Sequence, residues 1–531
     1  MEQGHRGDLE FGTIPRLVRM AAERHGDRPA VVDDGEVLSF ARLADEVSRA
    51  TRALMALGVA RGDRVAMWAP NSWKWIVAAL AAHSAGAAIV PINTRYKGEE
   101  AAYVLRKSSA RVLFTVSDFL GVDYVAMLRG VPGDLPALEH TVVVAGPPRE
   151  GALAWEAFVD RAQAVPAADA DARALAVVPD DLCDVMFTSG TTGRPKGATS
   201  AHAQTLRAFR DWSGIVGLRA GDRYLVALPF FHTFGYKAGF LACLMMGATS
   251  YPLAVFDVNA VLERVERDTI TVLPGPPSLY QTILARADVA SRSLGSLRLA
   301  VTGAAVIPPD LVRRMRDEIG FATVLTGYGL TEGCGVATLC REGDDAETIA
   351  LTSGRAIPDV DVRVVDDDGR EVPRGTPGEI VIAGYTVTRG FFDDAGATAE
   401  AFDAQGRLRT GDVGVMDERG YLRITDRKKD MFIVGGFNAY PAEIEAVLCR
   451  HEGIAQAAVV GAPDDRLGEV GVAFVVPRQG AALDGDALVA WSRERMANFK
   501  VPRRFVVVDA LPTNATGKVL KYELRERARV T

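Results

Sequence analysis

The segment from residue 185 to residue 197 constrains the fold more than any other part of the sequence. It begins with the apolar, β-prone run Val-Met-Phe and continues as Thr-Ser-Gly-Thr-Thr-Gly-Arg-Pro-Lys-Gly. Three glycines let the backbone turn closely around an anion, while the hydroxyls and Lys196 supply donors and positive charge. A Walker A loop would end in Gly-Lys-Ser or Gly-Lys-Thr, but here Gly197 follows the lysine. The segment predicts a buried strand that leads into a phosphate-binding loop of another kind.

Helical patterns alternate with short β-branched runs through the first half of the chain. We expect helices over 40–57 and 73–87 and strands over 88–91 and 111–115, an alternation typical of α/β layers with largely parallel sheets. Residues 147–179 are rich in alanine, proline and aspartate, which predicts a surface connection.

The later part of the chain has two different patterns. The runs 362–365 and 378–382 predict a hairpin in a small antiparallel or barrel-like β subdomain. Beyond residue 430 the pattern restarts, with a helix expected over 441–448 and strands over 457–460 and 472–476. We therefore expect an α/β protein with a large N-terminal domain of layered α/β subdomains plus the small β subdomain, and a small α+β C-terminal domain.

Composition excludes several classes of protein. The net charge of −7, from 61 basic and 68 acidic residues, argues against a nucleic-acid partner. The five scattered cysteines include no Cys-x-x-Cys pair, and the first ten residues carry acidic groups where an export signal would be apolar. The uncharged stretch between Lys237 and Asp257 contains glycines and a proline, so we expect a buried helix and a buried strand there, not a membrane span. These observations favour a cytoplasmic location.

Further motifs carry groups that suit a nucleotide. Gly-Tyr-Gly-Leu-Thr-Glu at 327–332 offers an aromatic ring for a base, a hydroxyl for phosphate and a carboxylate for Mg²⁺. Thr-Gly-Asp at 410–412 offers a carboxylate for ribose hydroxyls, Asp-Arg-Lys-Lys-Asp occupies 426–430, and Gly517 precedes Lys518.

In this order and spacing, the glycine loop, Pro-Phe-Phe-His at 229–232 and these motifs resemble the adenylate-forming superfamily of acyl-CoA synthetases, luciferases and peptide-synthetase adenylation domains. The resemblance covers essentially the whole chain. Within the superfamily, residues 230–239 and 271–277 are similar to actinobacterial ligases for steroid-derived, ring-containing acids.

The resemblance implies an ATP-dependent, AMP-forming acyl-CoA ligase with ATP, Mg²⁺ and CoA as reactants and cofactor, and a bulky apolar carboxylic acid as substrate. It also implies an AMP-binding domain over 1–426, a hinge over 427–430 that turns at Lys429, and a mobile C-terminal domain over 431–531. Three alternatives stay open: loading of a carrier protein, efficiency in only one half-reaction, and a nucleotide-binding module without catalysis. The sequence leaves open the identity of the acid, its pathway and whether the chain forms a homodimer.

Residue roles follow from the motifs as the resemblance implies them. The residues expected to act in catalysis are Lys518, Thr331, Glu332 and His232, with Glu332 also holding the metal. The residues expected to bind ATP or AMP are Thr188, Ser189, Gly190, Thr191, Thr192, Gly193, Lys196, Gly303, Ala304, Ala305, Gly327, Tyr328, Gly329, Thr331, Asp412 and Arg427. The expected CoA tunnel is lined by His232, Gly435, Gly436 and Phe437.

The acyl pocket is expected to be mostly small or apolar. Its predicted lining is His232, Tyr236, Lys237, Phe240, Thr302, Gly303, Thr326, Gly327, Cys334 and Gly335. His232 alone could be an ordinary core histidine, but its motif favours a place between the acyl pocket and the tunnel. Lys237 could bind a ketone or second carboxylate of the acid, although a lysine at a helix start is more often solvated, the interpretation we favour. Cys334 is expected to line the pocket and not to act as a nucleophile.

Overall fold

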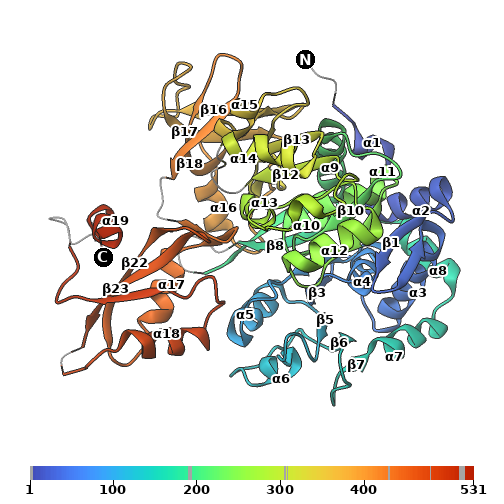
Figure 1. Ribbon diagram of the computed structural model, residues 1–531. Helices are drawn as coiled ribbons and strands as arrows, with labels where there is room; N and C mark the ends of the chain where they lie inside the picture. The colour runs from blue at the N-terminus through green and yellow to red at the C-terminus, as the bar shows by residue number, and fades with distance from the viewer. Residues whose placement is uncertain are drawn as a thin grey trace.

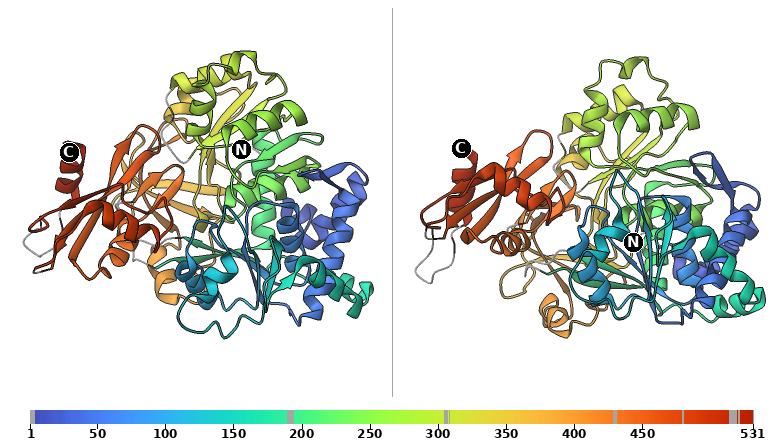
Figure 2. Two further views of the ribbon diagram at one scale, coloured as in Figure 1. Left: turned by 60° about the horizontal axis from the view of Figure 1, so that its bottom comes forward. Right: turned by 90° about the horizontal axis from the view of Figure 1, so that it is seen from below.

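A computed structural model describes residues 4–188, 194–303, 307, 309–427, 431–478, 480–512, 519 and 521–530. Figure 1 shows a large N-terminal part and a smaller C-terminal part, drawn in orange and red, on one side of it. The two further views in Figure 2 show the same division.

A seven-stranded sheet carries, at its edge, the hairpin that flanks the predicted phosphate-binding loop. Its order is β7-β6-β5-β3-β4-β8-β9, parallel throughout except for the antiparallel pair β8 and β9. The strands are β3 (Arg64–Trp68), β4 (Ala88–Pro91), β5 (Val112–Val116), β6 (His140–Ala145), β7 (Leu153–Ala154), β8 (Leu182–Thr188) and β9 (Lys196–Ala201). The predicted strand before the glycine loop is confirmed, since Val185 and Met186 of β8 are buried.

Two four-stranded sheets form a second layer of the N-terminal part. Their orders are β10-β11-β1-β2 and β12-β13-β14-β15. The strands are β1 (Pro29–Asp33), β2 (Glu36–Ser39), β10 (Arg223–Val226), β11 (Thr249–Pro252), β12 (Leu299–Gly303), β13 (Thr323–Tyr328), β14 (Thr338–Leu339) and β15 (Arg355–Ala356). In the parallel pair β12 and β13, Gly303 lies opposite Gly327, so both glycines stand at the carboxyl ends of their strands. Ligands of α/β sheets bind beyond such ends.

Helices cover these sheets. Those near the N-terminus are α1 (Gly7–Glu10), α2 (Ile14–His25), α3 (Phe40–Ala56), α4 (Trp73–Ser84), α5 (Gly98–Ser108), α6 (Tyr124–Arg129), α7 (Trp155–Asp160), η1 (Arg161–Ala164), α8 (Ala167–Leu175) and α9 (His202–Val216). Those that follow are α10 (Thr233–Gly235), the π-helix η2 (Tyr236–Leu241), α11 (Ala242–Met246), α12 (Val258–Asp268), α13 (Pro277–Leu284), η3 (Val289–Ser291), α14 (Pro309–Arg314), η4 (Met315–Ile319), η5 (Thr331–Gly333), α15 (Ala346–Leu351) and α16 (Ala395–Ala401).

The prediction of a surface connection over 147–179 is wrong in part, because this segment contains α7, η1 and α8. Trp155 and Phe158 of α7 are buried, and their rings pack against each other. The uncharged stretch after Lys237 is, as predicted, buried helix followed by the buried strand β11. Among the described residues, no helix has both the length and the apolar character needed to cross a membrane.

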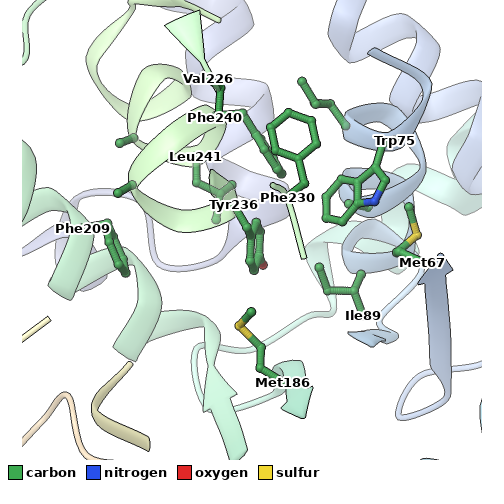
Figure 3. Packing of buried hydrophobic residues seen from close by; sticks show 14 of the residues in the cluster. Met67, Trp75, Ile89, Met186, Phe209, Val226, Phe230, Tyr236, Phe240 and Leu241 are labelled. Carbon is green, nitrogen blue, oxygen red and sulfur yellow. The ribbon is translucent and has the colours of Figure 1, made fainter. Parts of the chain in front are cut away.

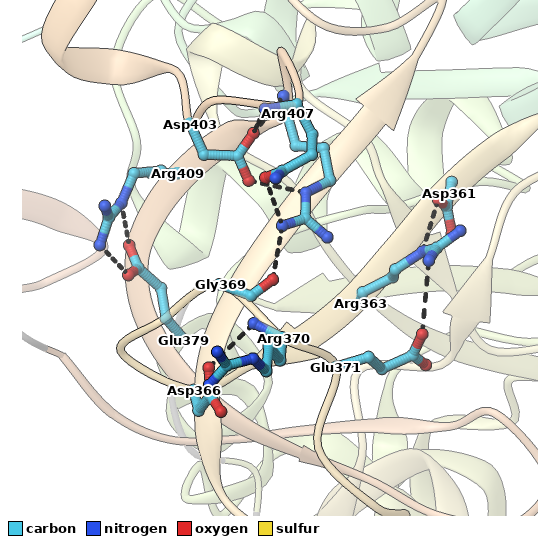
Figure 4. A network of polar contacts seen from close by, with 11 residues as sticks. Asp361, Arg363, Asp366, Gly369, Arg370, Glu371, Glu379, Asp403, Arg407 and Arg409 are labelled. Carbon is cyan, nitrogen blue, oxygen red and sulfur yellow. Dashed lines mark hydrogen bonds and ion pairs between the residues drawn. The ribbon is translucent and has the colours of Figure 1, made fainter.

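A small antiparallel sheet, β16-β17-β18-β19, follows the N-terminal layers and confirms the predicted hairpin. Its strands are β16 (Val360–Val365), β17 (Gly378–Gly384), β18 (Leu408–Met416) and β19 (Leu422–Arg427). Its inner residues, such as Ile380 and Ile382, are buried. Ion pairs also link its strands, such as Arg409 of β18 with the buried Glu379 of β17 at 2.7 Å (Figure 4).

The C-terminal part has a sheet of its own. β20 (Phe432–Val434), β21 (Phe437–Ala439), β22 (Ile454–Asp464), β23 (Gly468–Pro477) and β24 (Arg504–Val507) form it, with helices α17 (Pro441–Leu448), α18 (Gly485–Arg493) and α19 (Lys521–Val530). The boundaries 1–426, 427–430 and 431–531 stay predictions, and β19 runs to Arg427, the first residue of the predicted hinge. Pro441 opens α17 at its first position, as expected.

An aromatic cluster packs between the two N-terminal layers (Figure 3). Trp75 of α4 contacts the rings of Phe230 and Phe240, at centroid distances of 5.1 and 5.8 Å. Tyr236 lies beside them on η2 (Figure 3). This aromatic cluster fixes the helical segment that follows His232 against the first sheet.

Candidate active site

A cavity of about 1200 Å³ lies where strands of both layers end and the C-terminal part comes close. Most of the described residues predicted for the site line this one cavity. They are Thr188, Lys196, His232, Thr302, Gly303, Gly327, Tyr328, Gly329, Thr331, Glu332, Gly335, Asp412, Gly435, Gly436 and Phe437. Segments far apart in the sequence thus form one site.

The side of the cavity predicted to bind phosphate is built on the β8–β9 hairpin. Thr188 ends β8 and pairs with Lys196 at the start of β9. Thr188 Oγ1 donates a hydrogen bond of 2.9 Å to Glu332 Oε1, which joins the hairpin to the 327–332 motif. Lys196 Nζ lies 3.9 Å from Glu400 Oε2, and that glutamate is largely exposed.

The Glu332 carboxylate is partly enclosed, and its surroundings change its pKa. Desolvation raises its pKa, while the hydrogen bond from Thr188 acts in the opposite direction. The main chain of Glu332 is fixed as well, since its carbonyl accepts a hydrogen bond of 2.7 Å from the Thr388 amide. The carboxylate is therefore held at a defined place on the phosphate side.

The residues predicted for base and ribose lie next to each other. Tyr328 Oη donates a 2.6 Å hydrogen bond to Asp412 Oδ2, and both residues line the cavity. The turn that follows requires glycine, because a Cβ on Gly329 would overlap the Gly335 carbonyl. Cys334 and Gly335 both adopt positive φ, at 56° and 98°, so the chain doubles back directly behind Glu332.

His232 opens on the cavity just before the short helix α10. Its Nδ1 accepts a hydrogen bond of 3.2 Å from the Phe234 amide and so caps that helix. Desolvation lowers the pKa of His232, so the ring is neutral at pH 7. Because Nδ1 accepts, the hydrogen of the neutral ring sits on Nε2, which can donate to an oxygen of a ligand.

Five residues predicted for the acyl pocket do not line the cavity: Tyr236, Lys237, Phe240, Thr326 and Cys334. Tyr236 and Phe240 belong to the aromatic cluster behind the cavity wall, and the Tyr236 hydroxyl lies 3.0 Å from His83 Nε2. Thr326 is buried within β13. These positions pack the wall from behind, so their predicted role is corrected.

Lys237 is neither solvated nor open to a substrate. Its side chain is 0% exposed, and its Nζ lies 2.9 Å from Asp184 Oδ2, also 0% exposed. Nζ also donates to Ser200 Oγ at 2.9 Å and to Cys334 Sγ at 3.5 Å. Desolvation disfavours the ammonium ion, but Asp184 outweighs it and raises the pKa of Lys237. Both interpretations of this lysine drawn from the sequence are therefore wrong.

Several cavity residues were missed by sequence reasoning. Arg95 and Lys97 follow the carboxyl end of β4, and Trp212 lies within α9. Leu120 and Phe256 form an apolar part of the lining and are 72% and 49% exposed. A basic pair just after a parallel strand was a usable signal, whereas nothing in the local sequence marks Trp212.

The side of the cavity predicted to form the CoA tunnel is contributed by the C-terminal part. Gly435 and Gly436 have φ of 55° and 86°, a turn that suits glycine. The Phe437 ring stacks on Phe499 at 4.9 Å and lies 5.3 Å from the Arg95 guanidinium.

Some predicted residues lie outside the described part of the chain: Ser189, Gly190, Thr191, Thr192, Gly193, Ala304, Ala305, Lys429 and Lys518. Arg427 is described through its main chain, which pairs with Asp412 across β18 and β19.

The chain matches known proteins along most of its length. The family of AMP-binding enzymes matches residues 18–392, and the AMP-binding enzyme C-terminal domain matches residues 443–518. A propanoyl:CoA ligase of Rhodococcus jostii, named for a 7a-methyl-1,5-dioxo-octahydro-indenyl group, is 48% identical over 97% of this chain and 98% of its own. The ligase of the same name from Mycobacterium tuberculosis is 49% identical over 97% of this chain and 99% of its own.

A solved structure shows the same likeness. A double mutant of o-succinylbenzoate CoA synthetase from Bacillus subtilis, bound with its product analogue, has a TM-score of 0.81 and 26% identity, over 97% of this chain and 98% of that one. The fold is therefore that of adenylate-forming enzymes. With these matches and a cavity that unites the motifs, the chain belongs to the AMP-binding enzyme family and is an acid–thiol ligase of the AMP-forming type.

Proposed function

We propose that this protein is an ATP-dependent acyl-CoA ligase for a bulky, ring-containing carboxylic acid. The observation that carries the proposal is the single cavity whose walls combine Thr188 and Lys196, the His232 segment, and Gly435 to Phe437. Each wall suits one reactant: the triphosphate, the acid and the thiol.

The reaction has two steps. First, a carboxylate oxygen attacks the α-phosphorus of ATP and pyrophosphate leaves, which gives an acyl-adenylate. Then the CoA thiol loses its proton, its sulfur attacks the acyl carbon, and AMP leaves with the bonding electron pair. The adenylate supplies a phosphate leaving group where a free carboxylate would have to expel oxide.

We assign the roles by motif and position. Residues 188–193 and Lys196 hold the β- and γ-phosphates, and Thr331 meets the α-phosphate. Tyr328 stacks on adenine beside Gly303 to Ala305, while Asp412 and Arg427 bind the ribose. The Nε2 hydrogen of His232 orients the carboxylate of the acid. Lys518 stabilises the charge that develops in the first step.

Glu332 is the residue that would hold Mg²⁺. This ion keeps several waters and binds through one or two carboxylates together with substrate phosphates. A single carboxylate beside the phosphate hairpin fits that pattern, and among the described residues no cluster of three or more metal-ligating side chains offers another site. Bound there, the ion would neutralise phosphate charge.

The relatives suggest the class of acid. Both named ligases act on a propanoyl group attached to a fused ring with two oxo groups. The apolar lining at Leu120, Val255 and Phe256 suits such a ring system. Since Lys237 is paired with Asp184 outside the cavity, the ring oxygens of the substrate are met by other groups.

The two steps need different groups from the C-terminal domain. Lys518 serves the first step, while Gly435 to Phe437 line the tunnel for the second. We propose that the C-terminal domain rotates about Lys429 between the two. In the orientation described here, the 435–437 segment faces the cavity.

The test is a direct assay. Purified protein is given ATP, Mg²⁺, CoA and a panel of acids that contains the indenyl propanoic acid of the relatives, and AMP and acyl-CoA are measured. We expect both products in equal amounts with this acid, and little product with short-chain acids. The proposal fails if no acid in the panel yields an acyl-CoA.

Paired assays separate the alternatives. A carrier protein replaces CoA in one arm, and preformed acyl-adenylate replaces acid and ATP in another. A chain that loads a carrier, completes one half-reaction, or only binds nucleotide gives a different pattern in these arms. The homodimer and the cytoplasmic location stay predictions.

Two cavity carboxylates give a matched pair of variants. Glu332→Gln removes the charge beside Thr188, so adenylation should fall by about 100-fold or more. Glu400→Gln removes a carboxylate that is 75% exposed and should leave the rate within about twofold. Equal effects of the two variants would contradict the assignment of Glu332.

A further inference from the structure

Lys500 is a cation buried between the N-terminal and C-terminal parts. It lies between α18 and β24, and its side chain is 1% exposed. Its Nζ donates to Glu100 Oε1 of α5 at 2.7 Å and to Glu443 Oε1 of α17 at 2.6 Å. The Tyr96 ring covers the ammonium group at 4.3 Å. One carboxylate thus comes from each side of the interface.

This cluster is complete only while the two parts touch. Glu443 Oε2 is buried and makes no hydrogen bond within the described chain, and burial raises the pKa of Glu443. Glu100 Oε2 accepts from the Lys97 amide at 2.9 Å, so its carboxylate is held at the start of α5. A buried charge that loses one partner is strongly unfavourable, so the cluster favours the contact in which all three groups meet.

The cluster adjoins the thiol side of the cavity through two pairs of neighbouring residues. Arg95, which lies over Phe437, directly precedes Tyr96, which covers Lys500. Phe499, which stacks on Phe437, directly precedes Lys500. The position of the ammonium group therefore fixes the wall formed by Phe437.

We propose that Lys500 is a positioning residue for the thiol-transfer step: it joins Glu100 to Glu443 and holds the C-terminal domain in the orientation that brings Gly435, Gly436 and Phe437 to the cavity. The proposal rests on the proposed function, in which the domain rotates between the two steps. Adenylation uses another orientation, in which this cluster is open. Loss of the cluster therefore slows the second step and spares the first.

The experiment compares the two half-reactions in Lys500→Met, with the indenyl propanoic acid of the relatives as probe. Pyrophosphate release from acid and ATP reports the first step, and acyl-CoA formation from the preformed adenylate reports the second. We expect thiol transfer to fall by about 30-fold or more while adenylation stays within about threefold of the parent protein. Lys500→Arg, which keeps the charge, should recover most of the thiol transfer.

Arg450→Ala is the matched control, because Arg450 forms an exposed ion pair with Glu99 at 3.1 Å across the same interface. It should leave both steps unchanged. The proposal is overturned if Lys500→Met leaves thiol transfer intact, or lowers both steps equally, as a merely structural residue would. A parent protein that forms adenylate but no acyl-CoA would instead overturn the proposed function, and a circular dichroism spectrum of each variant shows that the fold is retained.

Discussion

Lys237 and Lys500 are both buried lysines, but Lys237 has all its partners within one packed region, whereas Lys500 has partners on both sides of an interface. Lys237 lies in the N-terminal core, where Asp184, Ser200 and Cys334 all belong to the same packed unit. Lys500 lies at the edge of the C-terminal part, and one of its two carboxylates belongs to the other side. A buried lysine–carboxylate pair thus fixes the wall behind the cavity at Lys237, and at Lys500 it fixes the orientation of the C-terminal part. The difference is whether water can return to the charges when the neighbouring parts separate.

The largest effect is expected from Lys237→Met. The substitution leaves Asp184 as an unpaired charge at 0% exposure, so the free energy of unfolding should fall by about 3–5 kcal/mol. Five of the six tryptophans precede residue 213, so urea unfolding followed by tryptophan fluorescence reports on this region.

Two further variants sharpen this result. Lys237→Met combined with Asp184→Leu removes both charges and should regain most of the loss. Lys74→Met removes a pair with Glu156, which is 77% exposed, and should cost less than about 1 kcal/mol. If all three variants are equally stable, the core pair does not fix the N-terminal region.

A pH series measures how much free energy it costs to protonate a buried histidine, His202, in the same N-terminal core. Burial lowers the pKa of His202 to about 4, and its ring packs on His83 at 5.4 Å. The unfolded chain therefore binds a proton below pH 6.5 that the folded chain refuses until about pH 4. Stability is lost as the pH falls through this window, by about 3 kcal/mol from His202 alone.

His202→Asn should reduce the slope of stability against pH between pH 6.5 and 4, as measured by urea unfolding at each pH. His140→Asn, at a half-exposed position on β6, is the control for the effect of the substitution itself. An unchanged slope in His202→Asn would show that this histidine does not link folding to pH.

The unfolding of Lys500→Met is expected to differ from that of Lys237→Met. Glu100 regains water when the two parts separate, so the tryptophan-detected free energy of unfolding should change by less than about 1 kcal/mol. A loss as large as that of Lys237→Met would show that the interface belongs to the N-terminal core.

The smallest effect is expected from Arg450→Ala. Its side chain and that of Glu99 are 64% and 62% exposed, and such pairs contribute about 0–1 kcal/mol. The thiol-transfer rate measured in low and high salt should change equally in this variant and in the parent protein. A salt response confined to the parent would assign this exposed pair a part in docking.

Structural features that depend on local sequence pattern were predicted correctly. The strand before the glycine loop, the 362–382 hairpin and the helix over 441–448 all follow from apolar runs and turn residues. The motifs also met at one cavity, because parallel strands end at the same edge of a sheet.

The errors come from contacts that only the fold creates. Asp184 lies 53 residues before Lys237, and nothing in the sequence around the lysine identifies Asp184 as its partner. The π-helix η2 turns Tyr236 and Phe240 into the core, although His232, four residues before Tyr236, lines the cavity. Over 147–179 a usable signal existed, since alanine favours helix.

The exposure of the cysteines decides where a fluorescent label can be attached to follow domain rotation. Cys183, Cys243, Cys334 and Cys340 are buried and closed to a bulky reagent. Cys449, just after α17 in the C-terminal part, is the exposed one. A fluorescent maleimide would therefore attach there without any engineering. Energy transfer to that dye from the tryptophans of the N-terminal part would follow domain orientation through a single turnover.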